Sequence, residues 1–419
     1  MSNIMGKSDQ GKSLFRKNFF TLFKGSFISQ LIPLAISPFL TRLYTPEDFG
    51  VLSLFVAITS ILGSVINGRY EQAIMLVNDK RKINLITLLS LLIALFISVF
   101  LLLILLIFNE TIIQLLDFPS FSIWLYYIPL VSFLISVFNT FNFYHLKQKE
   151  LKSISSSEIQ KATIFSVVQL ICPFFREGAF GLIIGKIIST FYTSIYLFKK
   201  SSFNFIIFDK KQLLQISKRF INFPKYTTPA ILLNNLSVSG IQLLIPFFYS
   251  ATTLGFYSIM NKVMSAPFGF IGNSISQAFL KEISDSKKNV YDVTKSILLK
   301  LVLISFIGYG LSFLLLEDFF QFVYGENWRV AGTFAKYLTP FFIFKFIASP
   351  LTSIHTAFEK QRLSFLLQIL MFLVSVGSLS YSYISELNFE QFLFLFSVLM
   401  SLYYILRILI VINISKKSK

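Results

Sequence analysis

Four lysines lie deep within long apolar stretches of the sequence, where a cation needs a partner: Lys161, Lys186, Lys262 and Lys345. Each is roughly 10 to 16 Å from the nearer end of its stretch at 1.5 Å per residue, and there a lysine costs about 2.5 to 3.5 kcal/mol unless it faces water or a counter-charge. No carboxylate lies comparably deep, although Glu158 shares a helix face with Lys161. We therefore expect a hydrated cavity that attracts anions. Snorkelling of the ammonium groups towards lipid headgroups is the alternative.

Two amide side chains add a polar face to another apolar stretch. Asn235 and Gln242 are seven residues apart in the stretch 226–248, with Ser239 between them. On a helix all three lie on one face. This face predicts either the lining of a path or hydrogen bonds between packed helices.

Enzymatic and metal chemistry find little support. His145 and His355 lie near the ends of apolar stretches, without cysteines or carboxylates at metal-ligand spacing. The single cysteine, Cys172, cannot form an internal disulfide. The segments between stretches are short and contain no nucleotide-binding glycine loop. We predict a protein that is not an enzyme and that needs no cofactor.

These residues are positioned by elements suited to a membrane. The 419 residues are 54% hydrophobic and 14% charged, with a mean hydropathy of +0.70. Apolar stretches of about 20 residues, each long enough to cross a hydrocarbon core as a helix, recur twelve times. We therefore predict an all-α integral membrane protein with twelve transmembrane helices. The stretches are 20–40, 49–68, 84–108, 122–143, 154–175, 178–198, 226–248, 254–279, 295–316, 334–358, 363–384 and 389–412.

The basic residues are distributed asymmetrically along this pattern. If the N-terminus is cytoplasmic, 28 of the 38 lysines and arginines fall in cytoplasmic segments and three in outer loops. This is the positive-inside rule, and it places both termini in the cytoplasm. Anionic membrane lipids are therefore the expected partners for most of the net charge of +18, and nucleic acid is not.

The chain repeats itself in two halves. "RLYTPEDFGVLSLF" at 42–55 returns 205 residues later as "FFYSATTLGFYSI", which pairs Phe49 with Leu254 and Gly50 with Gly255. Because six stretches separate the copies, the repeats are parallel, as in transporters that work by alternating access. We expect two pseudo-symmetric six-helix bundles, at 1–198 and 226–419, joined by a basic cytoplasmic linker at 199–225.

Five strings together resemble a known family. In order and across nearly the whole chain, they are similar to bacterial polysaccharide repeat-unit flippases of the O-antigen and capsule type (Wzx-like), in the multidrug/oligosaccharidyl-lipid/polysaccharide exporter (MOP) superfamily. The strings are "TRLYTPEDFGVLSLFVAITSI", "GRYEQAIML", "FPKYTTPAILLNN", "LGFYSIMNKVMSAPFGFIGNSISQAF" and "YGENWRVAG".

The resemblance implies a MATE-like fold in the bacterial cytoplasmic membrane. It implies as substrate an oligosaccharide on undecaprenyl pyrophosphate, made on the cytoplasmic face and moved to the outer leaflet for surface polysaccharide such as lipopolysaccharide or capsule. The polysaccharide polymerase and the chain-length machinery are the further partners that it implies.

Within that frame we assign roles to individual side chains. Lys186, Lys262 and Lys345 would attract the pyrophosphate or acidic sugars, and Lys24 and Arg69 would stand at the cytoplasmic entrance. Glu71 beside Arg69 is either a gate partner or a surface ion pair. Lys161, Asn235 and Gln242 complete the set of predicted substrate-binding residues.

The sequence also bears on three alternative functions. A flippase for lipid II would usually carry two more spans, and a flippase for teichoic-type glycans differs only in its cargo. A cation-coupled multidrug antiporter would need a deep carboxylate, which the first stretch lacks. A membrane glycan polymerase would need a large outer loop. Repeat-unit export therefore ranks first, another lipid-linked glycan second, and the drug antiporter third.

Overall fold

The computed structural model describes residues 2–108, 110–111, 118–204, 210–272, 275–276, 279–280, 282–283, 290–358 and 360–417, and every element within them is a helix. By its internal contacts the chain divides into two compact units. The first comprises Met1–Ile36 with Phe55–Leu232, and the second comprises Ser37–Leu54 with Leu233–Lys419. The bundle bounds 1–198 and 226–419 stay a prediction.

Ten helices of the described part are long and apolar enough to cross a membrane. They overlap ten of the twelve predicted stretches. Of the other two, 154–175 overlaps the helix Leu151–Ile171, which is more polar because it carries Lys152, Glu158 and Lys161. The stretch 254–279 overlaps a helix of only 17 residues, Ala251–Pro267. The all-α membrane fold is as predicted, while the count of twelve spans stays a prediction.

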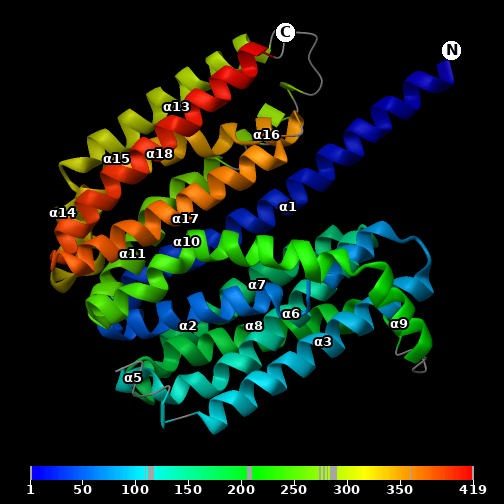
Figure 1. Ribbon diagram of the computed structural model, residues 1–419, viewed down its shortest axis with the longest axis horizontal. Coiled ribbons are helices and arrows are strands. Elements are labelled where there is room, and N and C mark those ends of the chain that lie inside the picture. The colour runs from blue at the N-terminus through cyan, green and yellow to red at the C-terminus, as the bar shows by residue number, and fades with distance from the viewer. Residues whose placement is uncertain are drawn as a thin grey trace. The chain divides into compact units, whose positions relative to one another are not determined.

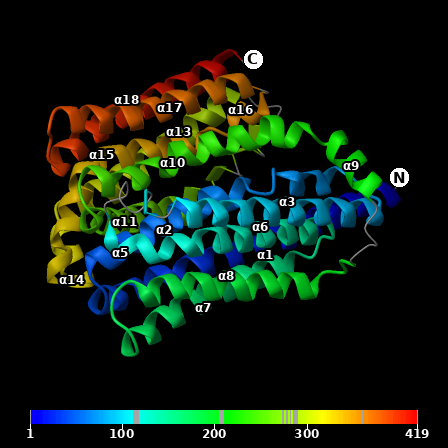
Figure 2. The same ribbon diagram turned by 60° about the horizontal axis from the view of Figure 1, so that its bottom comes forward.

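The first unit is built from helices that run side by side (Figures 1 and 2). The α-helices α1 and α2 each continue from one unit into the other. The bounds are α1 Ser2–Leu43, α2 Pro46–Val65, η1 Tyr70–Leu76, α3 Lys80–Ile107, α5 Pro119–Ser122, η2 Ile123–Tyr126, α6 Tyr127–Lys147, α7 Leu151–Ile171, η3 Cys172–Phe174, α8 Phe180–Lys200, α9 Lys210–Arg219 and η4 Phe223–Thr227.

The core of the first unit lies between η1, α3, α6, α8 and α9. Phe141 packs edge to face against Phe198 and Phe203, with ring centroids 5.3 and 5.8 Å apart. Leu213 and Ile216 of the amphipathic helix α9 are buried in the same cluster. Part of the basic stretch 199–225 is therefore packed onto the first unit through apolar side chains, while its lysines remain outside.

The second unit follows from α10 to the C-terminus (Figure 1). Its helices α13, α15, α17 and α18 pack against one another, and α11 packs on α15. The bounds are α10 Thr228–Phe248, α11 Ala251–Pro267, η5 Phe268–Gly272, α13 Val290–Phe313, α14 Leu316–Tyr324, η6 Glu326–Trp328, α15 Arg329–Leu351, α16 Ile354–Ala357, α17 Gln361–Ile384 and α18 Phe389–Lys417.

The repeated turn is explained by helix capping. Before α2, the Thr45 and Asp48 side chains each accept a hydrogen bond from the other residue's backbone N–H, at 3.2 and 2.9 Å. At the equivalent place before α11, the Ser250 hydroxyl accepts from the Thr253 N–H at 3.0 Å. Both copies thus satisfy the first free N–H groups of a helix, which accounts for the shared pattern of small polar residues.

The two copies of the turn also contact each other within the second unit. A Cβ added to Gly50 would collide with the Ala251 carbonyl oxygen, and one added to Gly255 would collide with the Pro46 carbonyl oxygen. Pro46 and Ala251 are themselves equivalent at the offset of 205. The contact is therefore reciprocal, as across a two-fold axis, and both glycines are needed for the close approach.

A buried tryptophan covers this contact. Trp328, 2% exposed, packs edge to face on Phe49 at 5.3 Å and on Phe256 at 5.5 Å between ring centroids. Its indole N–H donates to the Thr41 carbonyl at 3.1 Å. Trp328 therefore anchors residues 37–54 in the second unit, with its polar atom paired.

Candidate functional site

The end of α2 forms a sharp bend that presents Arg69 and Glu71. Gly68 and Arg69 both have left-handed backbone angles, with φ of 63° and 59°. Glycine adopts this region freely, whereas arginine does so only when its surroundings hold it. The Asn67 side chain accepts from the Arg69 backbone N–H at 3.1 Å, and the Arg69 guanidinium donates to the Ser64 carbonyl at 3.0 Å. The bend is thus fixed by its own polar groups.

Arg69 and Glu71 form an ion pair inside the first unit. Their closest N–O distance is 3.2 Å, and the two side chains are 12% and 0% exposed. Burial raises the pKa of the Glu71 carboxyl, although the Arg69 charge acts in the opposite direction. The alternative of a surface ion pair is therefore wrong, because the carboxylate is fully enclosed. The gate role of the pair stays a prediction.

The neighbouring linker closes over this bend. Gly68 lies against Pro224 of η4, and the Tyr70 hydroxyl donates to the Ser217 carbonyl of α9 at 3.1 Å. Any movement of α9 or η4 would therefore disturb the residues that hold Arg69. The contact of α9 and η4 with this bend could not be inferred from the sequence, because the sequence predicts only a linker at 199–225.

Lys161 and Lys186 are brought together on α7 and α8, which pack closely in the first unit. The charge of Lys161 acts on Lys186, and the charge of Glu158 acts on both lysines. The Lys161 Nζ lies 4.0 Å from the centroid of the Phe138 ring, a cation–π contact. Both lysines are only partly buried. Two cations and one carboxylate leave a net positive charge at this place.

Lys24 is exposed and lies on α1 beside the contact of α1 with α7, where Gly25 touches Ser155. Ser155 precedes Glu158 by one helical turn. The backbone thus places Lys24 on the same part of the first unit as the Lys161 and Lys186 pair.

Lys262 and Lys345 lie on α11 and α15, which pack together in the second unit. Both side chains are partly buried. The Lys345 Nζ lies 5.1 and 5.4 Å from the ring centroids of Phe341 and Phe342. Aromatic faces stabilise a desolvated cation without neutralising its charge, so Lys345 keeps its attraction for an anion.

Asn235 and Gln242 both lie on α10 and are partly buried. They belong to the second unit, like Lys262 and Lys345. Lys24, Arg69, Lys161 and Lys186 belong to the first. The predicted site residues therefore form two sets, one in each unit, and each set contains partly buried lysines.

A basic cluster at one end of the second unit was missed by sequence reasoning. His355 is 4% exposed, and both of its ring nitrogens are buried with no hydrogen-bond partner among the described residues. The charge of Arg407 on α18 acts on it, and the Arg407 guanidinium lies over the rings of Tyr403 and Tyr404 at 5.7 and 5.9 Å. Burial lowers the pKa of His355, and Arg407 lowers it further.

The loop around His355 is built like the loop around His145, 210 residues earlier in the chain. In both loops a backbone N–H five residues on donates to the histidine carbonyl: Glu150 to His145 at 2.9 Å and Lys360 to His355 at 2.8 Å. In the first loop that residue is a carboxylate, which lies 2.5 Å from His145 Nδ1. In the second loop it is a lysine. One histidine is consequently paired and the other is not.

Among the described residues, no group of three histidine, cysteine, aspartate or glutamate side chains could hold a metal ion. The chemistry of each set suits ligand binding. The sets contain partly buried cations, aromatic rings, and amides that can donate and accept hydrogen bonds. This chemistry suits an anionic group attached to a polar, hydroxyl-rich body.

The comparison that decides the family is with protein-family models. The model described as polysaccharide biosynthesis protein matches residues 39–332, which is more than half of the chain. The chain belongs to this polysaccharide biosynthesis protein family. A search of curated proteins gives no match.

Solved structures similar to this polysaccharide biosynthesis protein include a flippase and transporters. The lipid II flippase MurJ in an inward closed conformation is 12% identical and has a TM-score of 0.74, covering 93% of this chain and 86% of that one. An inward-facing MATE family transporter of the MOP superfamily, 12% identical, has a TM-score of 0.63 with 95% of each chain covered. A mutant of the MATE transporter VcmN from Vibrio cholerae, 13% identical, has a TM-score of 0.58 with 98% of each covered.

At these identities the likeness establishes the fold. The prediction of an all-α, MATE-like membrane protein is confirmed. The fold and the family match together show that the chain is a multi-pass membrane protein of polysaccharide biosynthesis. Its structural neighbours named above are a flippase and transporters, not enzymes.

Proposed function

We propose that the protein is a flippase that moves undecaprenyl-pyrophosphate-linked oligosaccharide repeat units from the inner to the outer leaflet of the bacterial cytoplasmic membrane, by alternating access. The observation that carries this proposal is the combination of membership in a polysaccharide biosynthesis family with a MurJ-like fold. A lipid-linked glycan is the cargo that unites the two.

The deep cations support this cargo. The pyrophosphate is a mobile anion, and Lys186, Lys262 and Lys345 offer it partly buried positive charge. Lys24 and Arg69 attract it at the cytoplasmic entrance, Glu71 serves as the gate partner of Arg69, and Lys161 adds to the field around Lys186. The amides Asn235 and Gln242 hydrogen-bond to sugar hydroxyls.

Orientation belongs to the same proposal. Both termini are cytoplasmic, because the basic residues gather in the segments that this orientation places inside. Labelling of single cysteines introduced at 110 and 200, in a variant without Cys172, tests it. A membrane-impermeant maleimide applied to intact cells should label position 110 and spare position 200, and the reverse pattern contradicts the orientation.

A second cargo is another lipid-linked glycan precursor, such as lipid II or a teichoic-type unit. The TM-score of 0.74 with MurJ favours it over a cation-coupled multidrug antiporter. The two glycan cargoes share the pyrophosphate or phosphate group and the polyprenyl chain, and they differ in the sugars.

Deletion of the gene followed by analysis of lipid-linked intermediates tests the function. Repeat units on undecaprenyl pyrophosphate should accumulate on the inner leaflet and surface polysaccharide should disappear, with restoration by the wild-type gene. Accumulation of lipid II with intact surface polysaccharide would show that the protein transports lipid II instead. Unchanged surface polysaccharide and unchanged lipid intermediates would overturn the proposal.

A further inference from the structure

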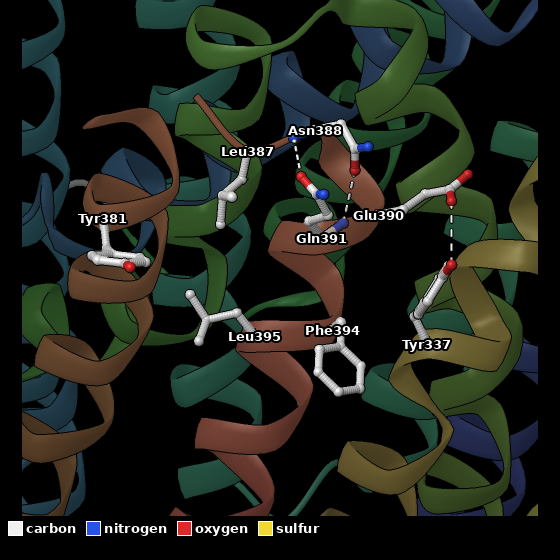
Figure 3. Close-up of a pocket in the computed structure, with 8 residues that line it drawn as sticks. All are labelled: Tyr337, Tyr381, Leu387, Asn388, Glu390, Gln391, Phe394 and Leu395. Carbon is white, nitrogen blue, oxygen red and sulfur yellow. Dashed lines mark hydrogen bonds between the residues drawn. The ribbon is translucent and has the colours of Figure 1, made fainter. Parts of the chain in front are cut away.

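A pocket of about 550 Å³ opens in the second unit where α17 ends, α18 begins and α15 passes by (Figure 3). Its volume is within the range of small-molecule sites. Tyr337 comes from α15 and Tyr381 from α17. Asn388 immediately precedes α18, and Glu390, Gln391 and Phe394 come from its first turns. None of these residues entered the predictions from the sequence.

Aromatic rings stand on both sides of the pocket. Tyr381 is 58% exposed and Phe394 is 60% exposed. In Figure 3 they flank the first turns of α18, with Tyr337 beside Phe394. Exposed rings give apolar faces against which the C–H face of a sugar ring can pack, and tyrosine adds a hydroxyl that remains in water.

Polar groups between the rings are held in place with part of their capacity left over. Glu390 Oε2 accepts from the Tyr337 hydroxyl at 3.2 Å, which leaves Oε1 for another donor. Asn388 Oδ1 accepts from the Gln391 N–H at 2.9 Å, and Gln391 Oε1 accepts from the Asn388 N–H at 3.0 Å. Because both amide oxygens face backbone donors, both NH₂ groups are identified and available to a ligand.

The charge of the lining excludes an anionic ligand. None of the residues that line the pocket is a lysine or an arginine, and Glu390 is a carboxylate. A phosphate or pyrophosphate would be repelled by Glu390, so neither the charged part of a lipid-linked glycan nor an anionic headgroup fits here. Hydroxyl groups fit, because they donate to the carboxylate and accept from the amides.

From this combination we infer that the pocket is a saccharide-binding site for one or two sugar rings of the cargo, separate from the lysines that attract its pyrophosphate. The inference rests on the proposed function for the identity of the sugar. In the proposed orientation, the end of α17 and the start of α18 lie on the outer face, where the glycan arrives. The site would hold the sugar there before release.

Saturation-transfer NMR on the purified protein in nanodiscs tests the site. The probe is the repeat-unit oligosaccharide, freed from its lipid by mild acid. Wild-type protein should transfer saturation to the sugar protons. Tyr381→Ala and Glu390→Gln should each weaken binding about tenfold, because a stacking face or a charged hydrogen-bond acceptor is lost, and Tyr381→Phe should retain most of it.

Tyr383→Ala is the matched control, since Tyr383 lies on the same helix, is 61% exposed and does not line the pocket. It should bind like wild type. Absence of sugar binding by the wild type overturns the inference, and so does equal binding by wild type, Tyr381→Ala and Glu390→Gln. An equal loss in Tyr381→Ala and Tyr383→Ala also overturns it, because the tyrosines would then only anchor the protein at the interface.

Translocation of the lipid-linked oligosaccharide by the wild type, measured in parallel in vesicles, separates the two proposals. If the wild type translocates but the pocket variants bind sugar as well as the wild type does, the saccharide site is contradicted and the flippase function is not. If sugar binding depends on the pocket residues but no translocation occurs, the saccharide site is supported and the flippase function is contradicted.

Discussion

Gly50 and Gly255 occupy equivalent places in two copies of one turn, and each lies against the first helical residue of the other copy. The close approach is between backbones, so a flexible side chain cannot move aside to relieve a clash. The repeat in the sequence is thus also a repeat in space, within one unit.

Alanine at either glycine should destabilise the protein. We expect Gly50→Ala and Gly255→Ala to cost about 1 to 3 kcal/mol each, since a methyl group would be forced against a carbonyl oxygen. Thermal unfolding in detergent measures it. Gly377→Ala is the control: a Cβ there meets no atom within 4 Å, and replacing a helical glycine should add about 0.5 to 1 kcal/mol. Equal melting temperatures for Gly50→Ala and wild type would contradict the contact.

The two partners of the buried ion pair should respond differently to removal. Arg69→Ala leaves the Glu71 carboxylate enclosed without its cation, at a cost of about 3 to 5 kcal/mol. Glu71→Gln should cost less, because burial already disfavours the charged carboxyl. The double variant should be more stable than Arg69→Ala alone. Thermal unfolding of the four proteins gives the coupling, and additive effects would show that the pair does not interact.

Stability should fall in mild acid because of His355. Burial holds its pKa below the ordinary 6.5, so the unfolded chain binds more protons than the folded one below that pH. Full stability is present above pH 6.5 and is lost as the pH falls, by at most about 1.4 kcal/mol per pH unit.

His355→Gln should remove this acid-dependent part, as measured by melting temperatures between pH 7.5 and 5.5. His145→Gln is the control and should retain it, because it keeps His355. The same fall in melting temperature for wild type and His355→Gln would assign the effect to other groups.

The sequence predicted those features that depend on composition and local spacing. Apolar length revealed the membrane helices, and the repeat indicated two equivalent turns. Their mutual contact through Gly50 and Gly255 could not be predicted, because it joins residues 205 positions apart.

The surroundings of single polar residues could not be predicted from the sequence either. Glu71 reads as a loop residue but is enclosed by the core of the first unit. His145 and His355 read alike, and only the folded loops show that one faces a carboxylate while the other has a lysine in its place. The lining of the pocket at Tyr381 and Glu390 comes from helix ends that are distant in the sequence.

Loss of the deep cations should impair export without preventing membrane insertion. We expect the variant with alanine at Lys186, Lys262 and Lys345 to reduce surface polysaccharide about tenfold or more, since an anion would lose several favourable charges. The control replaces the exposed Lys152, Lys200 and Lys360, which removes the same charge. Immunoblots of membranes confirm equal amounts, and normal export by the first variant would show that those lysines snorkel.

The most direct measurement is translocation by the purified protein in vesicles. Lipid-linked oligosaccharide extracted from the deletion strain is reconstituted with the protein, and a glycosidase added outside reports how fast inner-leaflet sugar becomes accessible. The account predicts rapid and complete cleavage with the wild type and slow, incomplete cleavage with the triple alanine variant. Cleavage that stops at the outer-leaflet fraction with wild-type protein, as in protein-free vesicles, would contradict it.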